Sequence, residues 1–158
     1  MSRLVVASIG PASSVQDGGR PGSQRYGLTS GGAMDRLSLV AANTLVGNEA
    51  LAAAIEIGPF GAAFTARDGA VRIALAGSSR NADIGGRGVA WDSSMTLADG
   101  ETVTLGFARG GSVCQLAIGG GVAGRPAFRP LAAHARGGLR PPDPRPTRPR
   151  RPLLGAAI

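Results

Sequence analysis

The 158-residue sequence contains no lysine, one cysteine, one histidine and few aromatic residues, namely four Phe, one Trp and one Tyr. A single cysteine, Cys114, excludes an intramolecular disulfide and fits a reducing compartment, so we expect a cytoplasmic protein. Since His134 is the sole histidine, we expect neither a Ser–His or Cys–His catalytic pair nor a metal site. No apolar run is long enough to span a bilayer and residues 1–10 lack a signal-peptide pattern, so no membrane contact is predicted.

The formal net charge of +7 comes from the C-terminal part of the chain. Residues 1–124 hold nine Arg against nine acidic residues, whereas residues 125–151 hold eight Arg against Asp143 alone. Eight of the eleven prolines also lie beyond residue 125. The first 124 residues therefore carry no excess charge, and we expect no nucleic-acid partner.

Short apolar runs separated by Gly, Asp and Ser are typical of a mainly β domain. We expect strands at residues 3–9, 54–57, 62–66, 71–76, 89–91, 94–97, 102–107 and 113–118. The pairs Asp68-Gly69 and Asp99-Gly100 predict hairpin-type turns. The predicted fold class is mainly β with one N-terminal helix (α+β), built as a barrel or a sandwich.

The predicted helix follows Asp35, whose carboxylate can cap the amides of the first turn. Gly47-Asn48 predicts its C-terminal end. Helical spacing predicts one apolar face that is formed by Leu37, Val40, Ala41, Thr44 and Leu45.

The composition changes near residue 128, so we divide the chain into a domain of residues 1–128 and a Pro/Arg-rich tail of residues 129–158. The tail has too few apolar residues between 140 and 152 to offset its ordering entropy. We expect it to be disordered or extended.

The glycine-dense loop Gln16-Asp17-Gly18-Gly19-Arg20 is the strongest candidate site. Glycine lets the main chain approach a ligand closely, and an arginine in such a loop can bind a carboxylate or phosphate through two parallel hydrogen bonds. Gln16, Asp17 and Arg20 are therefore candidate catalytic residues. The alternative is that Asp17 and Arg20 pair with each other and only shape the loop.

A second glycine loop, Ser30-Gly31-Gly32-Ala33-Met34-Asp35, precedes the helix. Its amides lie near a helix N-terminus, where an anion is favoured, so Ser30, Gly31, Gly32, Met34 and Asp35 are candidate substrate-binding residues. The alternative is a simple helix entry with Asp35 as the cap.

Two further polar residues interrupt apolar patterns. Asn43 on the helix is a further candidate for substrate binding, with the alternative that it fixes the two glycine loops. Glu56 could be a buried carboxylate serving as an acid or base, but alternation along its strand favours a solvent-facing side chain.

These segments resemble the biotin-dependent carboxyltransferase A/B domain family. The resemblance rests on Ser-Val-Gln-Asp-x-Gly-Arg-x-Gly at residues 14–22, on the second glycine loop with Met34-Asp35, and on Ile-Glu-Ile-Gly-Pro at residues 55–59. It covers residues 4 to 128. Family members have two halves, subdomains A and B, of which the second is cyclophilin-like. We expect that second half to be largely missing here and the tail to come from a frameshifted or truncated reading frame.

The family includes the C subunit of ATP-dependent 5-oxoprolinase, the second subunit of allophanate hydrolase and part of urea carboxylase. The resemblance implies a component of the C-subunit type that opens 5-oxoproline to glutamate with ATP, together with a carboxyltransferase C/D protein as the B subunit and a lactamase-type A subunit. Such a chain would be inactive alone. By the same resemblance, Arg20 would hold a substrate carboxylate or phosphate, and the Ser30–Met34 loop would supply amide donors to an oxyanion.

Two alternatives remain open at this point. One is a carboxyltransferase component of a urea or allophanate system, for which biotin would be the cofactor. The other is a non-catalytic regulator that binds a partner protein.

Overall fold

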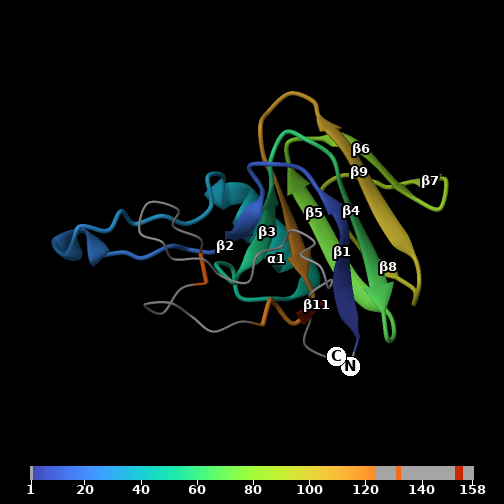
Figure 1. Ribbon diagram of the computed structural model, residues 1–158, viewed down its shortest axis with the longest axis horizontal. Coiled ribbons are helices and arrows are strands. Elements are labelled where there is room, and N and C mark those ends of the chain that lie inside the picture. The colour runs from blue at the N-terminus through green and yellow to red at the C-terminus, as the bar shows by residue number, and fades with distance from the viewer. Residues whose placement is uncertain (1, 124–130, 133–151, 155–158) are drawn as a thin grey trace.

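Two antiparallel β-sheets face each other in the computed structural model, which describes residues 2–123, 131–132 and 152–154 (Figure 1). Sheet A contains, in spatial order, β11 (Pro152–Leu154), β1 (Arg3–Ile9), β4 (Ala62–Arg67), β9 (Thr102–Ala108), β6 (Arg80–Ile84) and β7 (Arg87–Gly88). Sheet B contains β2 (Ser14–Gln16), β3 (Ala54–Ile57), β10 (Cys114–Ile118), β5 (Val71–Gly77) and β8 (Ser93–Leu97). The fold is mainly β with one α-helix in the described residues, as the sequence predicts, and the two sheets form a sandwich that does not close into a barrel.

The main core lies between the sheets, because alternate residues of each strand point inward. Phe64 on sheet A and Ile55, Ile73 and Leu116 on sheet B are fully buried there. The outer face of sheet B carries small residues where the helix α1 (Arg36–Val46) packs on it. Leu39 and Ala42 of α1 meet Ala54, Ala76 and Ala117 in this second cluster.

The buried face of α1 differs from the predicted one. Leu37 is 84% exposed, while Ser38, Leu39, Ala42 and Asn43 are buried. The physical reason is the close approach of the helix to sheet B, which requires small side chains at the contact. A Cβ on Gly77 of β5 would lie only 2.9 Å from Ser38 Oγ. The predicted cap and end are confirmed, with Asp35 at the N-cap and Gly47 in the left-handed conformation at the C-cap.

The two predicted turns connect strands of different sheets and do not form hairpins. The turn at Asp68-Gly69 joins β4 of sheet A to β5 of sheet B, and that at Asp99-Gly100 joins β8 of sheet B to β9 of sheet A. A tight turn fixes the reversal of the chain but not the sheet in which the next strand pairs. The predicted strand at 89–91 is absent, and the polar segments of β6 and β7 form the hairpin at this point.

Most of the predicted tail lies outside the described residues. Leu131 and Ala132 are described, as is β11, which pairs antiparallel with β1. The expected disorder of the tail stays a prediction, because most of the tail lies outside the described residues. The division of the chain at residue 128 also stays a prediction. No helix among the described residues has the length and apolar character needed to cross a bilayer.

Candidate functional site

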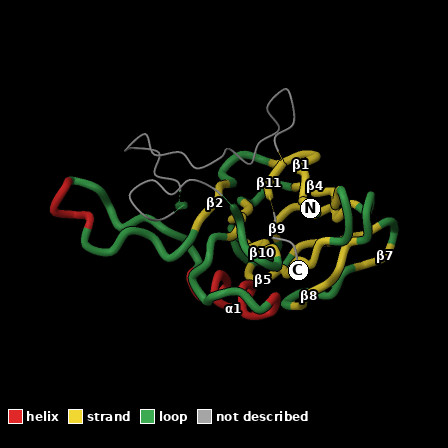
Figure 2. Tube along the Cα trace, turned by 90° about the horizontal axis from the view of Figure 1, so that it is seen from below, coloured by secondary structure: helices red, strands yellow, loops and turns green. Residues whose placement is uncertain are grey.

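The two glycine loops lie against each other at the base of a segment that projects from the sheets and has a short 3-10 helix (Ser23–Tyr26) at its far end (Figure 2). Their backbones are so close that a Cβ on Gly19 would lie 2.6 Å from a carbonyl oxygen of the second loop, and one on Gly32 would lie 2.9 Å from Asp17 O. Backbone hydrogen bonds from Arg20 N to Ser30 O and from Ala33 N to Asp17 O join the loops. Glycine is required at both contacts because any side chain would separate them.

Asp17 is buried and uses both carboxylate oxygens. Its Oδ1 accepts a hydrogen bond from Gly19 N at 2.8 Å. Its Oδ2 accepts from the amides of Leu131 (2.6 Å) and Ala132 (3.2 Å). One carboxylate thus stabilises its own loop and holds a segment more than a hundred residues away in the sequence.

Arg20 is 2% exposed and contacts the same distant segment. Its Nη2 donates to the carbonyl of Ala132, whereas Nε and Nη1 are buried and have no hydrogen-bond partner within the described part of the chain. The sequence analysis offered the alternative that Asp17 and Arg20 pair with each other. The described residues contain no such ion pair. Both side chains bind the backbone of residues 131–132 instead, and we call this arrangement the Asp17–Arg20 clamp.

A row of polar side chains crosses the outer face of sheet B next to the clamp. Ser14 of β2, Glu56 of β3 and Gln115 of β10 occupy directly paired positions on three adjacent strands. Gln16 joins this row, since its Nε2 donates to Ser14 Oγ at 2.9 Å. The side-chain oxygens of Gln16 and Gln115 are buried without a partner among the described residues.

Glu56 is 6% exposed, so the solvent-facing alternative is wrong. Its Oε2 accepts hydrogen bonds from Met34 N at 2.7 Å and from Gln115 Nε2 at 2.8 Å. Strand β3 is buried on both faces because the second glycine loop and α1 cover the outer face of sheet B, and this covering overrides the simple alternation. Glu56 therefore anchors the second glycine loop to the sheet.

Two amides of the second loop are already used within the protein. The Met34 amide donates to Glu56 and the Ala33 amide donates to Asp17 O, so neither is available to a ligand in this conformation. The Met34 side chain is 75% exposed. Only Ser30, Gly31 and Gly32 remain as candidate amide donors in this loop.

Asp35 and Asn43 have structural contacts. Asp35 accepts hydrogen bonds from the Ser38 amide (3.0 Å) and the Ser38 hydroxyl, which is the helix-cap alternative. Asn43 is fully buried; its amide donates to Ala52 O at 2.8 Å and accepts from Asn48 at 3.0 Å. Asn43 thus fixes the segment after α1 and not the glycine loops, and it has no exposed surface for a substrate.

The capping role of Asp35 gives a pH-dependent prediction. The hydrogen bonds from the side chain and then the backbone of Ser38 lower the pKa of Asp35 below its ordinary value of 3.8. A lowered pKa adds stability above the unfolded-state pKa, and that stability is lost as the pH falls through the folded-state pKa. Asp35→Ala should cost about 1 kcal/mol of unfolding free energy at neutral pH. Urea unfolding of both proteins should give a smaller difference near pH ~3, and a constant difference would contradict this account.

Sequence reasoning missed Gln115 and the 131–132 segment. The signal for Gln115 was available, because it interrupts an apolar strand as Glu56 does. The segment contributes only backbone groups to the clamp, so its residue types carry no signal. No group of three or more His, Cys, Asp or Glu in the described residues is placed to hold a metal ion.

Comparison with known proteins connects the chain to a family. The family model "Carboxyltransferase domain, subdomain A and B" matches residues 26–154. The C subunit of 5-oxoprolinase from Escherichia coli (strain K12) is 34% identical over 121 residues, which are 75% of this chain and 38% of that protein.

Two solved structures share the fold. The Kluyveromyces lactis urea carboxylase matches 96% of this chain with a TM-score of 0.88 and 25% identity. The K. lactis urea amidolyase matches 99% with a TM-score of 0.84 and 25% identity. The chain spans 38% of the E. coli relative, 14% of the urea carboxylase and 9% of the urea amidolyase.

Proposed function

Because the chain belongs to the family of carboxyltransferase domains with subdomains A and B, we propose that it is a component of an ATP-dependent 5-oxoprolinase, of the C-subunit type. The reaction opens the lactam of 5-oxoproline to glutamate with hydrolysis of ATP. The observation that carries this proposal is the 34% identity to a protein named as the C subunit of 5-oxoprolinase. The proposed partners are a carboxyltransferase C/D protein as the B subunit and a lactamase-type A subunit.

In this proposal Arg20 supplies the anion contact. Its Nε and Nη1 are buried and unpaired within the described residues, and an unpaired guanidinium in a protein interior costs free energy unless an anion binds it. A substrate carboxylate could accept hydrogen bonds from one of these nitrogens and from the second N–H of Nη2, which lies beside each of them in the guanidinium fork. The Gln16 and Gln115 side-chain oxygens could accept a hydrogen bond from a lactam N–H. Asp17 would keep the loop and residues 131–132 in place around the ligand.

The sequence contains no phosphate-binding loop of the Walker type for ATP. A Walker-type loop uses a lysine to contact the phosphates, and the chain contains none. We therefore assign ATP to the complex and derive no step through it.

A second candidate is a carboxyltransferase component acting on urea or another amide. The TM-score of 0.88 to a urea carboxylase favours it, and its cofactor would be biotin. Both candidates use a substrate with an amide N–H and a carbonyl.

Reconstitution tests the two candidates. The full chain is purified with a carboxyltransferase C/D protein and a lactamase-type protein and is assayed for ATP-dependent formation of glutamate from 5-oxoproline. A parallel reaction contains urea, a biotin carboxylase and a biotin carrier. Turnover only in the first reaction supports the 5-oxoprolinase proposal, and turnover only in the second supports the alternative. A complex that assembles but turns over neither substrate would indicate a non-catalytic regulator and contradict both.

A further inference from the structure

The edges of the two sheets are unequally protected. In natural proteins, short strands, charged residues or proline at the edge of a sheet prevent pairing with another chain. The edge strand β7 has two residues, including Arg87, and β11 has three, beginning with Pro152. The edge strand β2 has three residues and lies next to the clamp. The edge strand β8 has five residues, Ser-Ser-Met-Thr-Leu, without a charge or proline.

One side of β8 is fully paired, and the other has no partner strand in the part of the chain that the structure describes. All five residues pair with β5, from Val71 opposite Leu97 to Leu75 opposite Ser93. No strand among the described residues pairs with the other side, because β8 is the last strand of sheet B. Its outward N–H and C=O groups can therefore bind an extended backbone.

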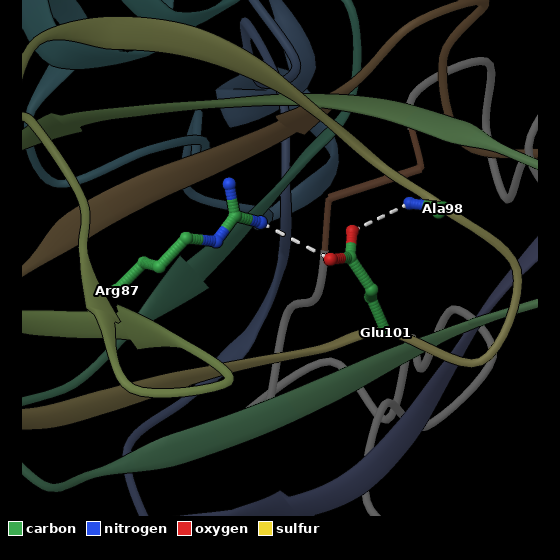
Figure 3. Close-up of polar contacts among 3 residues, drawn as sticks. All are labelled: Arg87, Ala98 and Glu101. Atoms are coloured by element: carbon green, nitrogen blue, oxygen red, sulfur yellow. Dashed lines mark hydrogen bonds and ion pairs between the residues drawn. The ribbon is translucent and has the colours of Figure 1, made fainter.

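A shallow cavity of about 250 Å³ lies at the same edge of the sandwich. Its lining includes Ser93, Ser94 and Met95 of β8 and Arg87 and Gly88 of β7. An ion pair of 3.1 Å from Arg87 Nη2 to Glu101 joins the β7 hairpin to the turn that follows β8, and Glu101 also accepts the Ala98 amide (Figure 3). This ion pair links the β7 hairpin, which contributes Arg87 and Gly88 to the cavity lining, to the turn after β8.

We propose that the free edge of β8 pairs antiparallel with β8 of a second copy of this chain. An antiparallel pair of identical strands has two-fold symmetry, so one strand that is compatible with itself suffices. With the axis at Met95, Ser94 of each copy faces Thr96 of the other. Hydroxyl-bearing residues at directly opposed positions stabilise such a pair.

Pairing of β8 with itself is also compatible with the positions of the sheets and of α1 in the two copies. A two-fold axis perpendicular to the sheet joins the two five-stranded sheets into one continuous sheet and keeps both α1 helices on the same face. Met95 and Leu97 already pack toward the core, so the pairing exposes no apolar side chain. A heterologous strand would need a matching sequence, whereas β8 itself contains no charged residue. The charge beside it on this face is Arg72 of β5, which is paired with Thr96 and donates from Nη2 to Ser94 Oγ at 3.0 Å. This inference does not depend on the enzymatic proposal.

Two double variants test the proposal through the charge at position 96. Ser94→Glu/Thr96→Glu places like charges directly opposite each other across the two-fold axis, and Ser94→Glu/Thr96→Lys places opposite charges there. We expect the wild-type chain to dimerise with a roughly micromolar dissociation constant, because the interface is small. The first variant should weaken dimerisation by about tenfold or more, and the second should not weaken it.

Sedimentation equilibrium of the full chain between about 1 and about 100 µM measures the dissociation constants of the wild type, the two double variants and a control variant. Thermal unfolding checks that the variants fold. Thr104→Glu is the control, because Thr104 is also exposed but lies on β9 in the middle of sheet A. It should leave the dissociation constant unchanged. A monomeric wild type overturns the proposal. The proposal is also overturned if both double variants fold and have equal dissociation constants, or if Thr104→Glu weakens dimerisation as much as Ser94→Glu/Thr96→Glu does.

Discussion

Gly19→Ala is expected to destabilise the protein by about 2–5 kcal/mol, whereas Gly22→Ala should cost only about 1 kcal/mol. Both glycines have a φ of 81°, so a Cβ costs a similar backbone strain at each position. The difference is the space around them. A Cβ on Gly19 would lie 2.6 Å from a carbonyl oxygen of the second loop, while one on Gly22 would meet nothing within 4 Å.

Urea unfolding of the three proteins measures the two costs. Hydrogen exchange of the Arg20 and Ala33 amides, which bond across the two loops, should rise in Gly19→Ala and stay slow in Gly22→Ala. Equal unfolding free energies for the two variants would show that the loops part easily and that their contact contributes little.

Arg20→Ala is expected to lower kcat/KM of the reconstituted complex by about thirtyfold or more, while Arg25→Ala leaves it unchanged. Both arginines belong to the projecting segment. Arg20 is 2% exposed and two of its nitrogens have no partner among the described residues, whereas Arg25 is exposed and lies over the Tyr26 ring. The control thus removes the same side chain from the same segment without touching the clamp.

Asp17→Ala separates anion binding from the clamp. It removes the bonds to Leu131 and Ala132 but leaves the Arg20 nitrogens in the chain. If Arg20 binds substrate, Arg20→Ala should raise KM for 5-oxoproline far more than Asp17→Ala does. If Arg20 acts only by holding Ala132, the two variants should lose activity equally and the double variant should be no worse. Equal losses would refute the anion contact and leave Arg20 as a brace of the loop.

The sequence predicted local structure well where one residue type determines it. The strands at residues 3–9 and 54–57 have the predicted bounds, because β-branched runs end there at glycine and proline. The cap at Asp35 and the end at Gly47 also rest on local chemistry. The buried helix face could not be predicted this way, because it depends on the small residues of sheet B against which the helix packs.

Of the candidate site, the sequence predicted only the features that depend on local residue types. Dense glycine correctly indicated two loops, but the close approach that the glycines allow is between the loops themselves, whereas we expected an approach to a ligand. The burial of Glu56 and the clamp on residues 131–132 depend on segments that are distant in the sequence and contribute through their backbone. Whether Gln16, Asp17 and Arg20 act in catalysis stays a prediction.

The position of β10 has a consequence for how the chain folds during synthesis. This strand lies at the centre of sheet B, between β3 and β5, yet it follows both in the sequence and ends at residue 118. The ribosome therefore releases β3 and β5 well before the strand that joins them. The nascent chain has to wait for most of its length before sheet B can form, and such non-local pairing is slow. We expect a late, nearly all-or-none folding step, with the partly synthesised chain dependent on chaperones until β10 has emerged.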